Sequence, residues 1–349
     1  MRIVVTGATG NVGTSVLAAL AKEPAVEEIV GLARRRPELT LPKTSWVAAD
    51  VLDADLARIF AGADCVIHLA WLIQPARDQR LLEAVNVEGS ARVFHAVRTA
   101  GVPALVYASS IGAYSPGPKS RRVDESWPTD GVPSAYYSRQ KAATERLLDG
   151  LEREAPSIRV VRLRPGLIFK REAASEIRRL FAGPLLPNPL VRRALIPIVP
   201  RTERLVFQAV HSLDVGEAYR LAAVANVRGA FNVAAEPVLD PDLLGKLLDA
   251  RPVPVSPGVL RAAAGVSWRM RLQPTEPSWV DMGLGVPLMD TARARTELGW
   301  TPRYGADEAL LELLDGMRAG ADYPTPPLER GAGGPLRVGE LLSGVGGRV

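Results

Sequence analysis

Two side chains spaced four residues apart could carry acid–base chemistry in this sequence. Tyr137 and Lys141 place a phenol and an ammonium group on one face of a predicted helix. A free tyrosine has a pKa of about 10, and a cation held nearby lowers that pKa toward neutral pH. Ser110 follows a short apolar run, where its hydroxyl could bind a substrate oxygen and stabilise developing charge. We therefore expect Tyr137 to act as a general acid or base, assisted by Lys141 and Ser110.

A glycine-rich loop follows the first apolar run of the chain. The segment TGATGNVG, residues 6–13, has glycines at positions 7, 10 and 13 between a predicted strand and a predicted helix. Gly7 permits a tight turn, Gly10 lets the backbone approach a pyrophosphate, and Gly13 lets the helix pack closely on the strand. The free N–H groups and the dipole at the N-terminus of the helix favour phosphate. The loop therefore predicts a dinucleotide site.

The residues after the second and third predicted strands bear on which dinucleotide binds. An acidic residue after the second strand usually holds the adenosine ribose and favours NAD, but here the sequence continues into Arg34 and Arg35. These arginines could hold a 2′-phosphate, so NADP is the preferred prediction and NAD the alternative. Asp50, after the third strand, could accept a hydrogen bond from the adenine amino group or cap a helix.

Short apolar runs alternate with helix-like segments through the first half of the chain. The expected strands are Ile3–Thr6, Ile29–Ala33, Trp46–Ala49, Cys65–Leu69, Ala104–Ala108 and Ile158–Leu163, and the expected helices include Val12–Leu20, Leu56–Phe60, Leu81–Ala100 and Ser138–Glu154. Strands that are apolar on both faces are typical of a buried parallel sheet with helices on both sides. The sequence therefore predicts an α/β fold with a doubly wound parallel sheet.

The second half of the chain is less regular. Proline and glycine punctuate Gly183–Pro200, which we expect to form loops with short helices. Further strands are expected at Leu205–Val210, returning to the sheet, and at Gly229–Val233; further helices are expected at Asp214–Ala225, Leu243–Leu248, Gly258–Leu272 and Ala306–Ala319. This pattern predicts a small, mostly helical lobe above the sheet. Residues 323–349 are rich in glycine and proline and are expected to run along the surface as a tail.

The composition argues against several classes of function. The 349 residues include one cysteine, Cys65, so no internal disulfide can form and a reducing compartment is expected. Three scattered histidines do not suggest a metal site, and no apolar run is long enough to cross a bilayer. The net charge of +5 comes from scattered arginine clusters without interleaved aromatic residues. We therefore expect a cytoplasmic protein that acts on a small molecule, without a metal, membrane or nucleic-acid partner.

Taken in order along the chain, these motifs resemble those of the extended short-chain dehydrogenase/reductases, the group that contains nucleotide-sugar epimerases and dehydratases. The matching segments are Gly7–Gly13, Asp64–Ala70, Asn86–Ser90, Ser109–Tyr114, Tyr137 with Lys141, Arg164–Gly166, Val210–Val215, Phe231–Val233 and Glu297–Pro302. The resemblance covers most of the chain. It implies a Rossmann-type domain formed by residues 1–165 and 203–235, with a C-terminal substrate lobe formed by residues 166–202 and 236–322.

The resemblance also implies roles for particular residues. Lys141 would lower the pKa of Tyr137 and hold the nicotinamide ribose, Asn86 would support the cofactor site, and Pro165 and Gly166 would lie beside the nicotinamide. The full set expected to bind cofactor is Gly7, Thr9, Gly10, Asn11, Val12, Gly13, Arg34, Arg35, Asp50, Val51, Leu69, Ala70, Asn86, Lys141, Pro165 and Gly166.

Two departures from the family pattern concern the substrate. Ser110 is followed by Ile111 and Gly112 instead of the acidic pair of the dehydratases. Beyond Gly166, after two further residues, the chain reads Phe169-Lys170-Arg171 where Tyr-Gly-Pro is common in the family. Trp71 begins a strongly apolar loop. We therefore expect Trp71, Ser110 and Phe169 near a substrate less polar than a sugar.

Three functions stay open at this point. The preferred one is an NAD(P)-dependent reductase or dehydrogenase acting on a carbonyl or a secondary alcohol. The second is a nucleotide-sugar epimerase with tightly bound NAD, in which a diphosphate would be held by Arg192, Arg193, Arg201 and Arg204. The third is a non-enzymatic NADP-binding sensor. A homodimer formed through the helix after Tyr137 is also expected from the resemblance.

Overall fold

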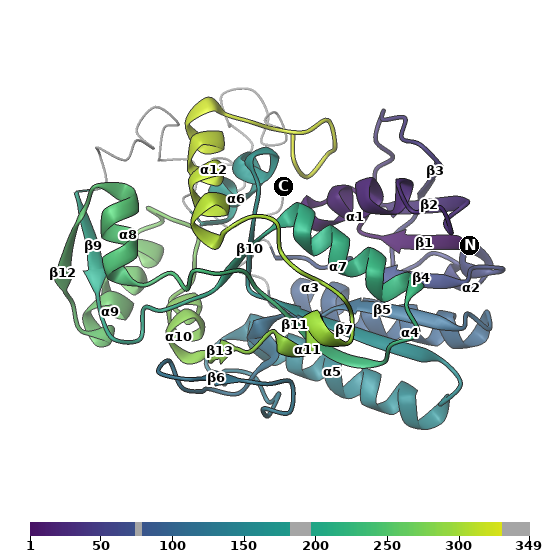
Figure 1. Cartoon of the computed structure of the whole chain (residues 1–349), viewed down its shortest axis with the longest axis horizontal. Coiled ribbons are helices and arrows are strands. Elements are labelled where there is room, and N and C mark those ends of the chain that lie inside the picture. The colour runs from purple at the N-terminus through teal and green to yellow at the C-terminus, as the bar shows by residue number, and fades with distance from the viewer. Residues whose placement is uncertain (74–78, 182–196, 330–349) are drawn as a thin grey trace.

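The expected doubly wound parallel sheet forms the centre of the protein. A computed structural model describes residues 1–73, 79–181 and 197–329. Seven strands pair in parallel in the order β11 (Gly229–Val233), β7 (Arg159–Pro165), β5 (Ala104–Ala108), β4 (Cys65–His68), β1 (Arg2–Thr6), β2 (Glu28–Ala33) and β3 (Thr44–Ala48). The order reverses on either side of β1, so the glycine loop that follows β1 lies where dinucleotides bind in open α/β sheets (Figure 1).

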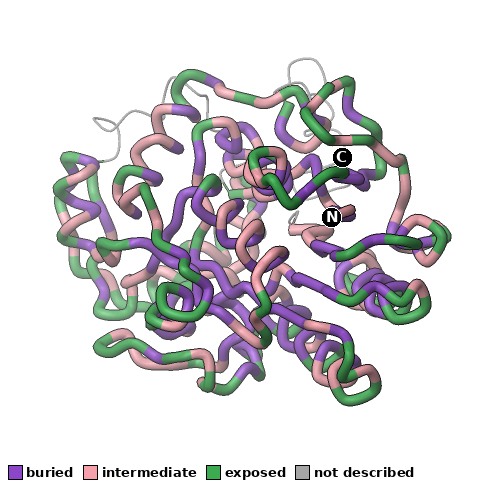
Figure 2. The backbone as a smooth tube through the Cα atoms, turned by 45° about the vertical axis from the view of Figure 1, so that its right-hand side comes forward, coloured by how far each residue is buried: buried purple, intermediate pink, exposed green. Residues whose placement is uncertain are grey.

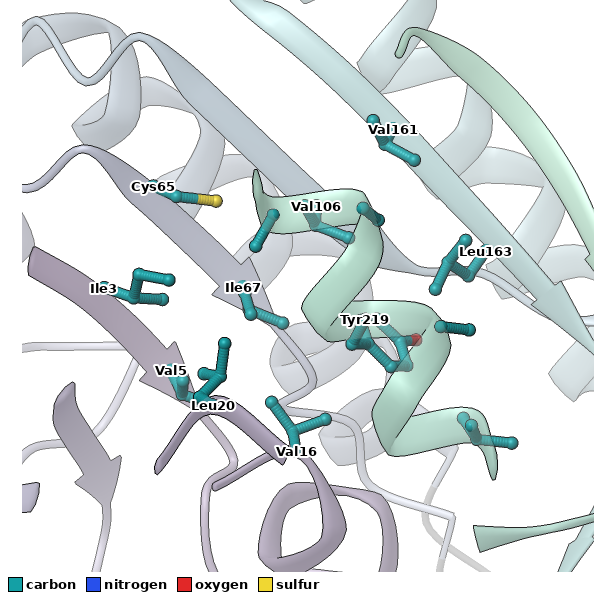
Figure 3. Packing of buried hydrophobic residues seen from close by; sticks show 14 of the residues in the cluster. Ile3, Val5, Val16, Leu20, Cys65, Ile67, Val106, Val161, Leu163 and Tyr219 are labelled. Carbon is teal, nitrogen blue, oxygen red and sulfur yellow. The ribbon is translucent and has the colours of Figure 1, made fainter. Parts of the chain in front are cut away.

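Alternate residues of each strand face opposite layers of helices. Ile3 and Val5 of β1 pack with α1 (Asn11–Ala21) and α7 (Ser212–Val224), and Figure 3 shows this cluster around Tyr219 of α7. Val4, between them, packs in the cluster on the other face. That face is covered by α2 (Leu56–Phe60), α4 (Gly89–Thr99) and α5 (Tyr136–Glu154). Burial on both faces explains why most of these strand residues are apolar, and Figure 2 shows buried backbone, in purple, through the centre of the molecule; β7 differs because it carries the buried Arg162 and Arg164.

The segment between β4 and α4 is more broken than the single helix expected at Leu81–Ala100. It consists of α3 (Gln79–Glu83), one π-helical stretch, η1 (Ala84–Glu88), and then α4. The wider π turn contains Asn86, whose side chain is fully buried. Such turns often occur where a helix must present a side chain to a functional site.

The C-terminal lobe combines helices with short two-stranded ladders. The ladders are β6 (Arg122–Val123) with β13 (Leu288–Met289), β8 (Leu167–Phe169) with β10 (Ala209–His211), and β9 (Ile198–Arg201) with β12 (Arg251–Pro254). The helices of the second half are α6 (Ala174–Phe181), α8 (Pro241–Leu248), α9 (Pro257–Arg269), α10 (Ser278–Gly285), α11 (Ala292–Thr296) and α12 (Ala306–Ala319), with α8 and α9 on the left of Figure 1.

One expected strand does not join the central sheet. The segment expected at Leu205–Val210 contributes only its end, as β10, and that strand pairs with β8. All of β11 pairs with β7, so this edge of β7 is not free to pair with another strand. The prediction that Leu205–Val210 returns to the central sheet is therefore wrong. The loops expected at Gly183–Pro200 fall mostly on residues 182–196, outside the described residues.

The chain does not simply run along the surface after Tyr323. Thr325 and Leu328 are fully buried, the backbone of residues 323–329 folds into tight turns, and Thr325 donates a hydrogen bond to the carbonyl of Thr9 in the glycine loop. We call Tyr323–Glu329 the C-terminal strap. The expectation of a surface tail is wrong for the strap, and residues 330–349 lie outside the described part. No helix among the described residues is long and apolar enough to span a membrane.

Candidate active site

A pocket opens over the glycine loop, at the C-terminal ends of β1, β2, β3 and β4. Its lining comprises Thr6, Gly7, Thr9, Gly10, Leu32, Ala33, Arg34, Arg35, Ala49, Asp50, Val51, Leu69, Ala70, Trp71, Leu72, Ile73, Val85, Glu176, Leu180, Pro326 and Pro327. Nine of the residues expected to bind cofactor are among them. The carboxyl ends of parallel strands meet at one edge of the sheet, which is why residues so far apart in sequence gather here.

The three glycines of the loop meet different steric requirements. Gly7 has a φ of +70°, and a Cβ there would lie 2.7 Å from the backbone nitrogen of Ala70. A Cβ on Gly13 would lie 2.4 Å from the carbonyl oxygen of Gly7, so the helix packs directly on the turn. A Cβ on Gly10 would meet only that carbonyl, at 3.6 Å, and Gly10 lines the pocket. The loop thus keeps a hollow open at Gly10, as a pyrophosphate requires.

Two buried polar atoms beside this pocket have no hydrogen-bond partner among the described residues. They are Oδ1 of Asn11, at the start of α1, and Nε1 of Trp71, after β4. Buried polar groups are normally satisfied, so these two atoms leave an acceptor and a donor for a bound molecule. The open hollow and the unpaired atoms fit a dinucleotide.

The end of the pocket at β2 and β3 carries both charge signs. Arg34 and Arg35 follow β2, line the pocket and are exposed. Oδ1 of Asp50 accepts a hydrogen bond from the backbone N–H of Leu52 at 3.1 Å. Asp50 therefore lines the pocket and caps a turn; it does not cap a helix, because the N-cap of α2 is Asp55.

Asn86 lies behind the pocket and ties two elements together. Its amide exchanges hydrogen bonds with the backbone of Leu72, at 2.7 Å and 3.0 Å, and donates to Oε1 of Gln140 at 2.9 Å. The loop after β4 is thereby fixed against α5, which carries Tyr137. Asn86 is a positioning residue in this arrangement.

Ser110, Tyr137 and Lys141 come together beyond this pocket, as the sequence predicts. Ser110 follows β5, and its hydroxyl accepts a hydrogen bond from the backbone N–H of Gly112 at 3.0 Å. Lys141, one helical turn after Tyr137 in α5, donates to the carbonyl oxygen of Ala108 at 2.6 Å. Its Nζ also lies 3.4 Å from the ring centroid of Trp71. The ammonium is thus held at the end of β5 by a carbonyl and an aromatic face.

The protonation of Tyr137 differs from the expectation. Burial raises its pKa to about 12, and hydrogen bonding to Ser110 opposes that shift. Lys141 was expected to lower this pKa, but its Nζ lies 5.8 Å from the ring centroid of Tyr137 and its own pKa is lowered well below the usual value by burial. That expectation is wrong for the described arrangement, because the ammonium faces Ala108 and Trp71. At neutral pH the phenol is protonated and can donate a proton.

Aromatic and thioether groups surround Tyr137 on the side of the lobe. The ring centroids of Trp71 and Trp279 lie 5.9 Å and 5.1 Å from that of Tyr137. Phe181, at the end of α6, packs edge-on against Trp279 at 5.4 Å. Met282, one turn further along α10, belongs to the same cluster. The reacting atoms would therefore meet an apolar wall.

A buried ion-pair network holds the catalytic helix on the sheet. Glu145 of α5 receives two parallel hydrogen bonds from Arg164 of β7, each 2.9 Å long, and one from Arg162 at 3.0 Å. Ser109, next to Ser110, donates to the same carboxylate. Burial alone would raise the pKa of Glu145, but the arginines lower it to about 2. The network fixes α5 relative to the ends of β5 and β7.

Other predicted site residues lie elsewhere. Phe169 packs in a separate cluster with Ala209 and Leu239, and the structure does not bring it to Tyr137, so that expectation is wrong. Pro165 and Gly166 lie at the end of β7, where the backbone N–H of Gly166 donates to the carbonyl of Val233. Neither lines the pocket over the glycine loop.

The structure adds residues that the sequence did not single out. Trp279 and Met282, three positions apart, lie on one face of α10; their spacing in the sequence predicts an apolar face but not its partner. Glu176, Leu180, Pro326 and Pro327 line the dinucleotide pocket from α6 and the C-terminal strap. No spacing in the sequence points to these four residues.

Comparison with known proteins settles the family. The model of the NAD dependent epimerase/dehydratase family matches residues 3–234. The chain belongs to this family. Among solved structures, MoeE5 in complex with UDP-glucose and NAD and the UDP-glucose 4-epimerase of Thermotoga maritima each superpose on this family member with a TM-score of 0.69 at 20% identity. Each comparison covers 92% of this chain and 99% of the other. At this identity the likeness establishes the Rossmann-type fold.

The curated relatives of this family member are distant. An uncharacterised protein of Mycobacterium tuberculosis is 29% identical over 91% of this chain, but the match spans only 30% of that longer protein. A 3-beta-hydroxysteroid dehydrogenase of Mycolicibacterium neoaurum is 26% identical, with 90% of each chain covered.

Proposed function

We propose that the protein is an NAD(P)-dependent oxidoreductase that interconverts a carbonyl group and a secondary alcohol on an apolar substrate. The observation that carries this proposal is the position of Tyr137, which lies with Ser110 and Lys141 at the end of β5 and is walled by Trp71 and Trp279. A relative named as a hydroxysteroid dehydrogenase supports an apolar substrate.

The residues suggest how reduction would proceed. A bound nicotinamide cofactor supplies the hydride. Ser110 orients the substrate carbonyl by donating a hydrogen bond to its oxygen, and Tyr137, protonated at neutral pH, donates its proton to that oxygen. This transfer leaves a phenolate on Tyr137, and Lys141, which contacts Ala108 and Trp71, holds the end of β5 beside it. In the reverse direction the phenolate accepts the alcohol proton.

NADP is the proposed cofactor within this scheme. Arg34 and Arg35 line the pocket directly after β2, where a carboxylate would otherwise bind the ribose hydroxyls of NAD. Their guanidinium groups suit a 2′-phosphate. The MoeE5 structure named above contains NAD, which makes NAD the alternative.

Nucleotide-sugar epimerisation is the second candidate, supported by the family and its structural relatives. Two of the arginines expected to hold a diphosphate are already engaged, however. Arg201 pairs with Asp242, and Arg204 donates to the backbone carbonyls of Leu284 and Gly117. The other two, Arg192 and Arg193, lie outside the described residues. These contacts favour the oxidoreductase over the epimerase, and the presence of Ser110, Tyr137 and Lys141 together favours both over a sensor.

Substitution of Tyr137 tests the proposal. Tyr137→Phe should lower turnover by roughly 10²–10⁴-fold while the dissociation constant for NADPH stays within about twofold. Tyr136→Phe is the matched control, since its hydroxyl receives only a hydrogen bond from Trp279 at 3.3 Å, and it should keep most of its turnover. Net oxidation of NADPH with a ketone distinguishes an oxidoreductase from an epimerase, which shows no net change in cofactor absorbance. Wild-type turnover by Tyr137→Phe would refute the assignment.

A further inference from the structure

The C-terminal strap is held against the glycine loop by buried polar contacts. Oγ1 of Thr325 donates a hydrogen bond to the carbonyl oxygen of Thr9 at 2.8 Å, and Thr325 is fully buried. The side chain of Arg179, from α6, donates to the backbone carbonyls of Pro327 and Glu329. Leu328, also fully buried, anchors the end of the strap. The strap is therefore a packed part of the domain and not a loose end.

A second buried contact engages the same loop near the strap. Nζ of Lys170 donates to the carbonyl oxygen of Asn11 at 2.9 Å and to the hydroxyl of Thr14, and it lies 5.9 Å from the ring centroid of Tyr323. Lys170 and Thr325 thus bind carbonyl oxygens of the segment that carries the phosphate-binding N–H groups. These two contacts fix the position of the loop, and the first N–H groups of α1, which have no partner within the helix, can face a phosphate.

The strap also forms part of the pocket wall. Pro326 and Pro327 line the pocket together with Thr9 and Gly10, whereas their neighbour Pro324 is exposed and does not line it. Proline has a restricted backbone and no N–H, so it offers a rigid apolar surface that makes no demand for hydrogen bonds. Such a surface can cover a bound ligand and exclude water from it.

We propose that the C-terminal strap is part of the dinucleotide site, where Pro326 and Pro327 cover the pyrophosphate and the adjoining ribose of the cofactor. The proposal rests on the proposed function only in taking a nicotinamide dinucleotide as the ligand of this pocket. It gives residues beyond the matched family segment, 3–234, a direct part in holding the cofactor. Because the wall is bonded to the loop through Thr325, loss of that bond should speed cofactor release.

Charge placed on the strap tests whether it faces the cofactor. In the full chain, Pro327→Glu should weaken NADPH binding by about tenfold or more, because a carboxylate in the wall repels the pyrophosphate. Pro327→Lys should bind at least as tightly as the wild type. Pro324→Glu, the matched control, adds the same charge outside the pocket and should leave the dissociation constant unchanged. Binding is followed by quenching of tryptophan fluorescence.

A purely structural role predicts different results. If the strap only stabilises the fold, Pro327→Glu and Pro327→Lys should lower the thermal midpoint alike and shift NADPH affinity alike, which overturns the proposal. Thr325→Val, which removes the bond to Thr9 at nearly constant volume, should raise the NADPH dissociation rate by about fivefold. Slower release, or tighter binding, would mean that the strap blocks the pocket and would also overturn the proposal.

The binding assay separates this inference from the proposed reaction. Suppose that the wild type binds NADPH and that charge at Pro327 changes this affinity, but that no carbonyl or alcohol substrate is turned over. This result supports the role of the strap and refutes the oxidoreductase. Turnover with equal affinity in Pro327→Glu and Pro324→Glu refutes the strap alone. A wild-type protein that binds neither NADPH nor NADH refutes both.

Discussion

Gly112 packs directly against Tyr137, the proposed acid, so one added methyl group there should slow turnover. A Cβ on Gly112 would lie 2.8 Å from Cε1 and 3.0 Å from Cδ1 of Tyr137, and 3.2 Å from the sulfur of Met282. Gly112 lies in a short 3₁₀ turn, η2 (Ile111–Ala113), directly after Ser110. Any response to the methyl group therefore moves the tyrosine relative to the serine that would hold the substrate.

The size of the effect follows from these distances. Ordinary van der Waals contact requires 3.4 Å or more, so the ring must move by roughly half an ångström. The ring cannot retreat freely, because Trp71 and Trp279 pack against it. Misplacement of a catalytic group by about 1 Å can cost about 10²-fold in rate. Gly112→Ala should therefore lower kcat by about tenfold to a hundredfold.

The assay compares kcat, NADPH affinity and thermal stability in the same preparations. Gly112→Ala should lose turnover while its NADPH dissociation constant stays near the wild-type value, because Gly112 does not line the dinucleotide pocket. Gly150→Ala is the control. It lies in α5, the helix of Tyr137, with nothing within 4 Å of the added Cβ, and should be stabilised by up to about 1 kcal/mol. Unchanged kcat in Gly112→Ala would show that the position of Tyr137 relative to Ser110 does not limit the reaction.

Three further predictions concern charge. Glu145→Gln should destabilise the protein by about 3–5 kcal/mol in denaturant titration, because it leaves buried Arg164 without a carboxylate; a loss below about 1 kcal/mol contradicts this. The depressed pKa of Glu145, about 2, means that its stabilisation is complete above pH 4.5 and is lost as pH falls toward 2, measurable as a falling thermal midpoint. Burial raises the pKa of Glu176, which lines the pocket, to about 7, although the charges of Arg179 and Lys170 oppose this shift. NADPH affinity should therefore fall as pH rises through 7, because the ionised carboxylate repels the cofactor. Glu176→Gln should abolish that fall, and an unaltered pH profile in the variant would refute this. Replacing Arg34 and Arg35 together by alanine should weaken NADPH binding by about tenfold or more and spare NADH, and equal losses for both cofactors would refute the 2′-phosphate site.

Local patterns in the sequence predicted the fold and much of the site. Alternating apolar runs and helical periods predict the central sheet, since a strand buried on both faces consists mostly of apolar residues. Gly7, Gly10 and Gly13 predicted the loop because the steric requirement for glycine at each position is visible in the local sequence. The helical repeat alone places Tyr137 and Lys141 one turn apart in α5.

Contacts between segments far apart in sequence could be decided only by the tertiary structure. The raised pKa of Tyr137 arises from burial, and Lys141 is held away from it by Ala108 and Trp71; no spacing along the chain encodes either fact. Phe169 has a suitable side chain for an apolar site but packs elsewhere, because the pairing of β8 with β10 directs it into the cluster around Leu239. The composition of the C-terminal strap predicts a tail along the surface, yet Thr325 donates to the carbonyl oxygen of Thr9, 316 positions away in the sequence. Burial depends on what the rest of the chain places opposite a residue, and composition alone does not contain that information.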